Sequence, residues 1–253
     1  MKKINFPILI ALLLSFAFFE VKAQDVTVDE ILDGYFENTG GKDAWLNLKG
    51  TKTLAKLNQG GLEIPLEIVQ LKDGRQYTKI SIQGTELYQG VYDGETLWSI
   101  NFQAMQPEKA EKEATDNFKL ALKDFPSPFL NYKDKGYTVE LAGTETIDGT
   151  ETYKLKLTKD PKMIDGKETE DVSYYFFDKE AFILLAQETA ITQGPQAGQI
   201  GQITMSDYDE VDGLYFPFSV SQGLKGGASQ PVSVSEIQLN PEVDASVFAF
   251  PGN

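Results

Sequence analysis

Short segments of alternating apolar and polar residues, separated by recurrent turn signals, dominate this 253-residue sequence from Thr51 onward. The alternation is clearest where Leu62, Ile64, Leu66 and Ile68 lie two residues apart. This period is typical of a strand with one buried face, and an Asp-Gly pair is typical of a two-residue hairpin turn. The turn signals are Asp73-Gly74, Gln83-Gly84, Asp93-Gly94, Asp148-Gly149, Asp165-Gly166 and Asp212-Gly213. Together they predict a mainly β fold, an antiparallel meander of about ten or eleven strands.

The later strands can be placed from the same pattern. We expect them at residues 137–141, 151–157, 172–177, 183–191, 200–207, 214–221 and 232–239. They follow one another without an inter-domain linker, so we expect residues 24–253 to form a single domain.

Three short helices interrupt the alternating pattern. Thr27 and Glu30 form a capping box that starts the first helix, and Gly40-Gly41 ends it. A second helix is predicted from Lys42 to Leu48. The third, from Pro107 to Phe125, has an apolar stripe at helical spacing. Its stripe consists of Ala110, Ala114, Phe118, Ala121, Leu122 and Phe125.

A sheet of this size curls, and its apolar face has to be covered. The predicted helices supply only about 40 residues for this purpose. Either the sheet closes into a packed barrel, or the helices plug a half-barrel and leave an apolar cavity. The content of 16 Phe, 11 Tyr and 2 Trp supports a large apolar interior and is compatible with both.

The N-terminus has the three parts of a secretory signal peptide. Lys2 and Lys3 precede an apolar run from Phe6 to Phe19, and Val21-Lys22-Ala23 provides a cleavage site. We therefore expect residues 1–23 to be removed after Ala23 and the protein to be exported to the periplasm. The alternative is an uncleaved anchor, but the run is shorter than the roughly 20 apolar residues that span a bilayer. There is no cysteine to carry a lipid anchor.

The composition excludes several classes of function. The chain contains neither His nor Cys, which excludes Ser-His-Asp and Cys-His catalysis and His- or Cys-based zinc sites. Its formal charge is −15, and the predicted signal peptide is itself positive, so the rest is about −17. Nucleic acid would be repelled. We expect no cofactor and no resident metal.

Acidic residues leave two minor alternatives open. Residues 207–213 are rich in oxygen ligands, but their spacing misses the EF-hand calcium pattern, and we expect a solvated hairpin turn there. A pair of carboxylates could serve a glycoside hydrolase, yet the sequence singles out no such pair. A non-enzymatic protein is therefore the prediction.

Several motifs resemble a known family. The hairpin Asp93-Gly94-Glu95-Thr96-Leu97-Trp98 is similar to a "DGKTLW" hairpin of the outer-membrane lipoprotein-sorting family, the LolA-like periplasmic carriers. The segments 127–130, 209–217 and 243–251 resemble further elements of this family in the same order.

This resemblance implies an incomplete antiparallel β-barrel that encloses an apolar cavity plugged by short helices. It implies a carrier for acyl chains of lipoproteins or lipids, acting as a monomer between a membrane donor and a receptor. The helix from Pro107 to Phe125 is then the candidate lid. Candidate cavity residues are Ile80, Trp98, Phe118, Leu122, Phe129 and Phe176. The family closes its lid with an arginine, and Arg75 or Lys72 lies in the corresponding region.

The acidity of this chain is unlike that of the familiar carriers, so the cargo remains open between a lipoprotein, a glycolipid and another acylated molecule. A sensor or interaction module with the same fold is the alternative function. Its cavity would read an acyl group or a peptide offered by a partner.

Overall fold

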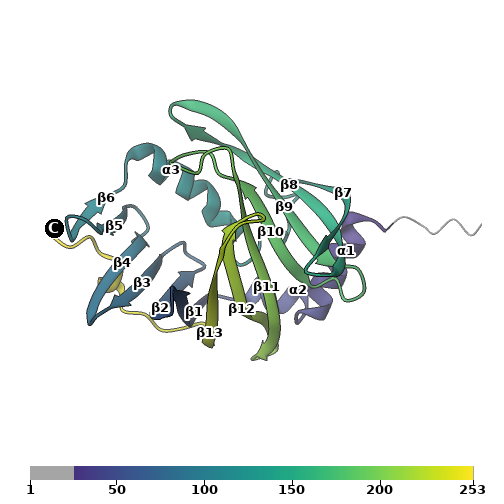
Figure 1. The fold of residues 1–253 in the computed structure, drawn as a ribbon, viewed down its shortest axis with the longest axis horizontal. Coiled ribbons are helices and arrows are strands. Elements are labelled where there is room, and N and C mark those ends of the chain that lie inside the picture. The colour runs from purple at the N-terminus through teal and green to yellow at the C-terminus, as the bar shows by residue number, and fades with distance from the viewer. Residues whose placement is uncertain (1–25, 253) are drawn as a thin grey trace, which may run out of the picture.

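Thirteen strands form one open antiparallel sheet in the computed structural model, which describes residues 26–252 (Figure 1). The predicted signal peptide, residues 1–23, lies outside these residues. The first strands are β1 (Gly50–Gln59), β2 (Leu62–Leu71), β3 (Gln76–Ile82), β4 (Thr85–Tyr92), β5 (Leu97–Asn101) and β6 (Gln106–Lys109). The others are β7 (Thr138–Ile147), β8 (Thr150–Ile164), β9 (Lys167–Asp178), β10 (Leu184–Ala190), β11 (Ile200–Val211), β12 (Leu214–Leu224) and β13 (Ser229–Leu239).

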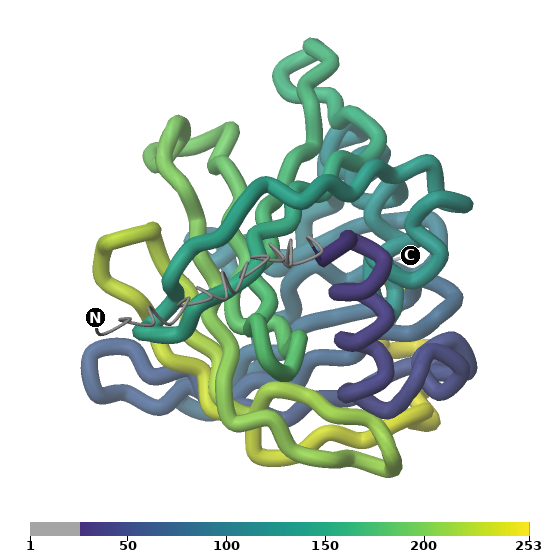
Figure 2. Tube along the Cα trace, turned by 90° about the vertical axis from the view of Figure 1, so that its right-hand side faces the viewer, coloured from purple at the N-terminus to yellow at the C-terminus, as the bar shows by residue number. Residues whose placement is uncertain are grey.

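The sheet consists of two meanders joined by one long-range pairing. Strands β1–β6 follow one another, as do β7–β13, and β1 pairs with β13 at the centre. The outermost strands, β6 and β7, do not pair with each other, so the barrel is incomplete, as predicted. In Figure 2 the strands curve round the molecule, and the first helix, in purple, lies in front of them at the end that faces the viewer.

The helices are α1 (Val28–Asn38), α2 (Lys42–Asn47), α3 (Lys112–Ala121) and the 3-10 turns η1 (Leu122–Asp124) and η2 (Ala245–Phe248). The capping box of α1 is confirmed: Thr27 Oγ1 accepts from the Glu30 N–H, and the Glu30 carboxylate accepts from the Thr27 N–H. Helix α3 and η1 belong to the crossover that carries the chain from edge strand β6 to edge strand β7.

Most of the predicted hairpin turns have the expected geometry. Both residues of Asp148-Gly149, Asp165-Gly166 and Asp212-Gly213 have positive φ, as a type I′ turn requires. Both residues of Gln83-Gly84 also have positive φ. At Asp93-Gly94 only the glycine has positive φ, and the aspartate side chain accepts hydrogen bonds from two following N–H groups instead.

Two details of the sequence prediction are wrong. The sheet has thirteen strands among the described residues, more than the ten or eleven expected. One of the additional strands is β6, where a helix was predicted to begin at Pro107. Pro107 opposes Ile100 in this strand, and β6 is an edge strand, the place in a sheet where a residue without an N–H group is tolerated.

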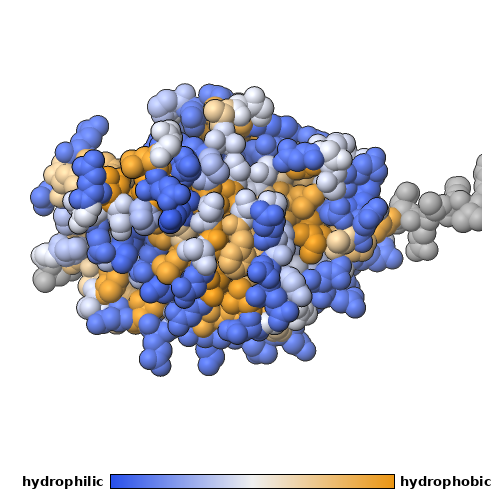
Figure 3. Space-filling view, turned by 60° about the horizontal axis from the view of Figure 1, so that its bottom comes forward, coloured by the Kyte–Doolittle hydropathy of each residue, from blue (hydrophilic) through white to orange (hydrophobic). Residues whose placement is uncertain are grey.

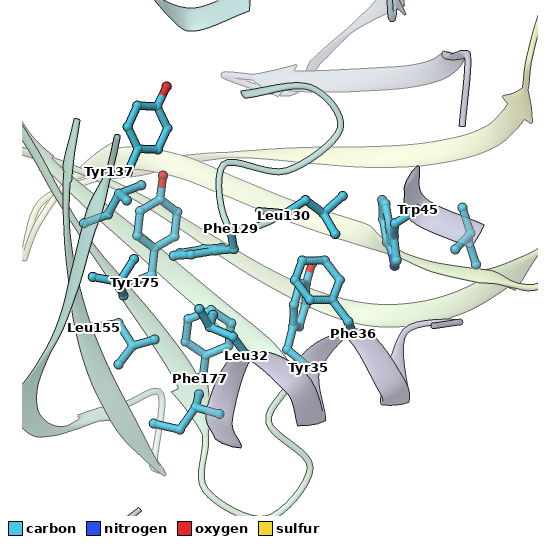
Figure 4. Close-up of a cluster of buried hydrophobic side chains, with 14 of the residues drawn as sticks. Leu32, Tyr35, Phe36, Trp45, Phe129, Leu130, Tyr137, Leu155, Tyr175 and Phe177 are labelled. Atoms are coloured by element: carbon cyan, nitrogen blue, oxygen red, sulfur yellow. The ribbon is translucent and has the colours of Figure 1, made fainter. Parts of the chain in front are cut away.

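The largest core cluster lies between α1 and the concave face of β7–β9 (Figure 4). Figure 4 shows Leu32, Tyr35 and Phe36 of α1 pointing toward Phe129 and Phe177. The ring of Phe129 makes edge contacts with Tyr175 and Phe177 on β9, at centroid distances of 4.7 and 5.6 Å. Helix α1 and the segment around Phe129 thus fill one end of the half-barrel.

Candidate functional site

A hollow of about 600 Å³ lies on the concave face of the sheet, beside the filled end of the half-barrel. Its volume is in the range typical of small-molecule binding sites. The hollow is lined by Trp45, Leu48, Thr51, Thr53, Ala55, Leu57, Leu66, Ile68, Gln70, Thr78, Ile80, Phe125, Pro126, Phe216, Pro217, Val220, Gln222, Val232, Val234 and Ile237.

The floor of the hollow follows from strand alternation. Ile80 on β3 opposes Leu66 on β2, which in turn opposes Ala55 on β1. Ala55 opposes Val234 on β13, so these four side chains form one row on the concave face. The charged residues between them along the strands, such as Lys56, face the other side of the sheet. Strand alternation therefore gives the hollow a floor of apolar side chains.

Aromatic residues close the end of the hollow next to the core. Trp45 of α2 packs against Phe216 of β12, with ring centroids 5.2 Å apart. The indole N–H of Trp45 donates to the backbone oxygen of Thr39, which fixes the ring. Phe125 and Pro126, which follow η1, cover the hollow from the crossover side.

The hollow contains no ionisable side chain among its described lining residues. Asp, Glu, Lys and Arg make up 24% of the sequence, yet none of them is among the twenty described lining residues. An uncharged surface of this kind suits an apolar ligand, because an ionic group placed there would lose hydration without gaining a counter-ion. The outer surface contrasts with it: Figure 3 shows apolar patches within a predominantly hydrophilic face.

The predicted cavity residues fall into separate environments. Ile80 lines the hollow. Phe118 and Leu122 lie on the inner side of α3 and η1 and line a smaller pocket of about 270 Å³. This pocket shares Gln70, Phe125 and Pro126 with the hollow, so the two are neighbours.

The other three predicted residues do not border the hollow. Phe129 is 4% exposed and belongs to the core cluster under α1. Trp98 and Phe176 lie on the convex face of the sheet. Trp98 is covered by the C-terminal segment, where its indole N–H donates to the backbone oxygen of Phe248. Phe176 lies under the ammonium groups of Lys154 and Lys225.

Neither candidate latch residue contacts α3 through its charged group. The Arg75 guanidinium forms an ion pair with Asp73 at 2.8 Å and lies over the ring of Phe248. The ammonium of Lys72 donates to the backbone oxygen of Leu46 at the end of α2. Arg75 therefore stabilises the C-terminal segment, and Lys72 stabilises the second helix.

Helix α3 is instead held to the β8–β9 hairpin by two other residues. The Asn117 side chain donates to the Met163 backbone oxygen at 2.6 Å and accepts from the Met163 N–H at 2.9 Å. The Glu113 carboxylate accepts from the N–H groups of Asp165 and Gly166 at 2.9 Å each. We call these four hydrogen bonds the α3 clasp.

The opposite side of α3 rests on the first meander through apolar contacts. Phe118 packs on Tyr92, with ring centroids 4.9 Å apart. Leu122 lies against Gly74 so closely that a Cβ added there would approach its side chain to 3.1 Å. The glycine of the Asp73-Gly74 turn thus makes room for the end of the crossover helix.

A buried charged cluster anchors the segment after α3. The Lys159 ammonium lies 2.9 Å from Asp124 of η1 and 3.3 Å from Asp171 of β9, and Lys162 also pairs with Asp171. Burial opposes the charge of Lys159, but its two carboxylate partners raise its pKa. Burial also lowers the pKa of nearby Lys135 to about 8. This cluster is a structural anchor, because none of its members lines the hollow.

The central floor of the hollow was not predicted from the sequence. Thr53, Ala55 and Val234 are small and carry no distinctive chemistry. A signal was present in residues 51–57, where Thr, Thr, Ala and Leu alternate with Lys52, Leu54 and Lys56. Such alternation identifies an uncharged face, although it does not say that the face is left open.

Two features of the described residues bear on the type of site. Residues 26–252 contain no helix that is long and apolar enough to cross a membrane. They also contain no group of three or more acidic residues placed to hold a metal ion. Residues 207–213 form the end of β11 and its turn into β12.

Comparison with known proteins shows similarity in the fold. No protein-family model matches the sequence, and no curated protein matches it. A LolA superfamily protein from Nitrosomonas europaea has a TM-score of 0.51 at 17% identity, over 88% of this chain and 98% of that one. A domain assigned as an outer membrane lipoprotein-sorting protein from Vibrio parahaemolyticus has a TM-score of 0.51 at 11% identity, over 87% and 94%.

A DUF1329 family protein from Desulfovibrio piger is similar to the same degree, with a TM-score of 0.51 at 16% identity over 88% of this chain and 97% of that one. The family resemblance inferred from the sequence is therefore confirmed at the level of the fold.

Proposed function

We propose that this protein is a periplasmic, non-enzymatic carrier that holds an acyl chain of a lipoprotein or lipid in the concave hollow and moves it toward the outer membrane. The observation that carries the proposal is the apolar hollow without an ionisable lining residue, in a chain that is otherwise strongly acidic. The fold of LolA superfamily and lipoprotein-sorting domains supports it.

The dimensions of the hollow are compatible with an acyl chain. From Ile80 on β3 to Val220 on β12 the lining crosses five adjacent strands, about 19 Å at a strand spacing of about 4.8 Å. An acyl chain in a membrane spans half of a hydrocarbon core that is about 30 Å thick. Each methylene group removed from water stabilises the complex by about 0.8 kcal/mol, so hydrophobic burial alone provides useful affinity.

The proposed route of exchange involves α3. This helix joins the two edges of the sheet and is fastened to each by a few side chains, so opening it separates no strands. Release of the α3 clasp would widen the access to the hollow near Phe125 and Pro126. A rigid sheet with a movable crossover fits a carrier that must both shield and release its cargo.

The periplasmic location rests on the predicted signal peptide. In that compartment the carrier would take its cargo from a donor at the inner membrane and pass it to a receptor at the outer membrane, acting as a monomer. The alternative function, a sensor or interaction module with the same fold, uses the same hollow. It differs in that bound ligand would stay with the protein rather than be transferred to acceptor membranes. The hydrolase alternative has less support, because none of the lining residues that the structure describes is a carboxylate.

Direct binding of a fluorescent fatty-acid probe tests the proposal. Val234→Trp places an indole in the middle of the hollow, and we expect at least tenfold weaker binding of the probe. Ser233→Trp is the matched control, since the neighbouring residue is exposed on the other face of β13. Absence of binding to the wild-type protein, or an equal loss in both variants, would overturn the proposal.

Native mass spectrometry of protein purified from its own periplasm provides the complementary test. The carrier predicts co-purified lipid or lipoprotein, displaced in the Val234→Trp variant and retained in Ser233→Trp. Transfer of that ligand to acceptor vesicles distinguishes the carrier from the sensor, because the sensor predicts retention.

A further inference from the structure

A second hollow, of about 640 Å³, adjoins the first at the edge of the sheet where β10 and β12 end and β11 and β13 begin. Gln222 lines both, so the two form one continuous surface. The second hollow contains the side chains of Gln187, Gln196, Gln222 and Gln230, together with Thr189. We call it the glutamine pocket. Its lining, like that of the first hollow, has no charged residue among those described.

Strand register places three of the glutamines in one row. Gln187 on β10 opposes Ile203 on β11, which opposes Gln222 on β12, and Gln222 opposes Gln230 on β13. Two residues further along β12 and β13, about 7 Å away, Val220 opposes Val232 in the apolar hollow. The concave face therefore changes from amides to aliphatic side chains within one step along the strands.

The glutamine amides are accessible to a ligand. Gln222 is exposed and Gln230 is half-buried. The amide of Gln187 makes a hydrogen bond of 3.5 Å with Thr189 Oγ1, which is long and readily exchanged. Each amide offers two N–H donors and one oxygen acceptor, so a row of them can both donate to and accept from hydroxyl or amide groups.

The nearest charges are directed elsewhere. Lys225 follows Leu224 of the pocket, but its ammonium lies 2.8 Å from both Glu145 and Glu188. It also lies over the ring of Phe176, on the convex face. An anionic head group in the glutamine pocket would thus find no free cation among the described residues that line it, and it would lose much of its hydration.

We infer that the glutamine pocket binds the uncharged, hydroxyl- or amide-bearing head group of a lipid whose acyl chain lies in the adjoining hollow. The inference rests on the proposed function and adds a specificity to it: neutral lipids are preferred over anionic ones. The preference comes from amides that satisfy a neutral polar head and from the absence of a counter-ion for a negative one.

Calorimetric titration with two ligands that share an acyl chain tests this inference. We expect monooleoylglycerol, which is neutral, to bind roughly tenfold more tightly than oleate at pH 8, both below their aggregation concentrations. Gln222→Lys supplies a cation in the pocket, and it should bring the two affinities together by strengthening the binding of oleate. Gln238→Lys is the matched control, because it lies on β13 opposite Lys52, on the convex face.

The outcomes separate the inference from the proposed function. If both ligands bind with equal affinity, and Gln222→Lys leaves their ratio unchanged, the inference fails while the carrier proposal stands. If neither ligand binds, the carrier proposal fails as well. An equal effect of Gln222→Lys and Gln238→Lys would show a general effect of charge and would also overturn the inference.

Discussion

Asn117 makes two hydrogen bonds with the backbone of a single residue, Met163, and so joins α3 to the tip of the β8–β9 hairpin. The side-chain amide of Asn117 donates to the backbone carbonyl of Met163, and its oxygen accepts from the backbone N–H of Met163. Glu113, one helical turn earlier, accepts from the next two free N–H groups of that tip, those of Asp165 and Gly166. Backbone groups of the long hairpin thus bind two side chains of α3. These four hydrogen bonds can form together only when the helix occupies one particular position.

The double variant Glu113→Ala/Asn117→Ala should loosen α3. Each net hydrogen bond contributes about 0.5–1.5 kcal/mol, so loss of the four bonds of the α3 clasp should lower the local free energy of opening by about 2–6 kcal/mol. Amide hydrogen exchange along α3 should accelerate accordingly. Dissociation of a bound fatty-acid probe, followed by stopped-flow fluorescence, should also become faster.

Asp116→Ala is the control for this prediction, because Asp116 forms an ion pair with the exposed Lys112 on the same helix and takes no part in the α3 clasp. Unchanged exchange in α3 of the double variant would contradict the clasp as the feature that holds the helix. Faster amide hydrogen exchange in α3 with unchanged dissociation of the probe would show that opening of α3 does not control release of the ligand.

The affinity for acyl ligands should rise with chain length. Each added pair of methylene groups should strengthen binding by about 1.6 kcal/mol, about fifteenfold, until the hollow is full. A series of neutral monoacylglycerols, titrated calorimetrically, measures the slope and the length at which it ends. A slope near zero throughout the series would mean that the chain does not enter the hollow. Val234→Trp should shorten the length at which the affinity stops rising.

The local features of the fold could be predicted from the sequence. The capping box at Thr27 and the turns at Asp148, Asp165 and Asp212 are determined by residues a few positions apart. The seven strands expected after residue 137 correspond to β7–β13. Strand β6 was missed because a proline followed by Glu and Lys is also a common helix start, and only the pairing with β5 decides between the two.

The site was less predictable, since it depends on long-range pairing and on which face is covered. The floor of the hollow requires β1 to pair with β13, residues almost two hundred positions apart. The sequence marks Trp98 and Phe176 as large apolar residues and candidates for the cavity, and both side chains are buried. It does not indicate on which face they lie, because the C-terminal segment covers Trp98 and lysine side chains cover Phe176 on the convex side.

The C-terminal segment should contribute strongly to stability. Phe248 is fully buried on the convex face against Tyr77, and its backbone oxygen accepts from Trp98. Phe248→Ala should lower the free energy of unfolding by about 3–5 kcal/mol, as measured by urea denaturation. Phe102→Ala, at a residue that is 54% exposed, should have little effect. Equal stabilities of the two variants would mean that the segment is not held to the sheet.

The stability of the protein should depend on the protonation of Lys135. Burial lowers its pKa to about 8 from 10.5, and the neighbouring Lys123 and Lys159 add to this effect, while Asp124 opposes it. Its ammonium donates to the Ser127 backbone oxygen in the segment that follows α3. Between pH 8 and 10.5 the folded protein has lost this proton, whereas the unfolded chain retains it.

Because the unfolded state then binds more protons, the free energy of unfolding contributed by this residue rises with pH over that interval. The wild-type protein should therefore gain stability relative to Lys135→Met as the pH increases from 8 to 10.5, and the difference should be constant below pH 7. Urea denaturation of both proteins at a series of pH values measures the difference. Lys133→Met is a control, since exposed Lys133 pairs with Asp29 and has a raised pKa. A difference between wild type and Lys135→Met that does not change with pH would show that Lys135 titrates as an ordinary lysine.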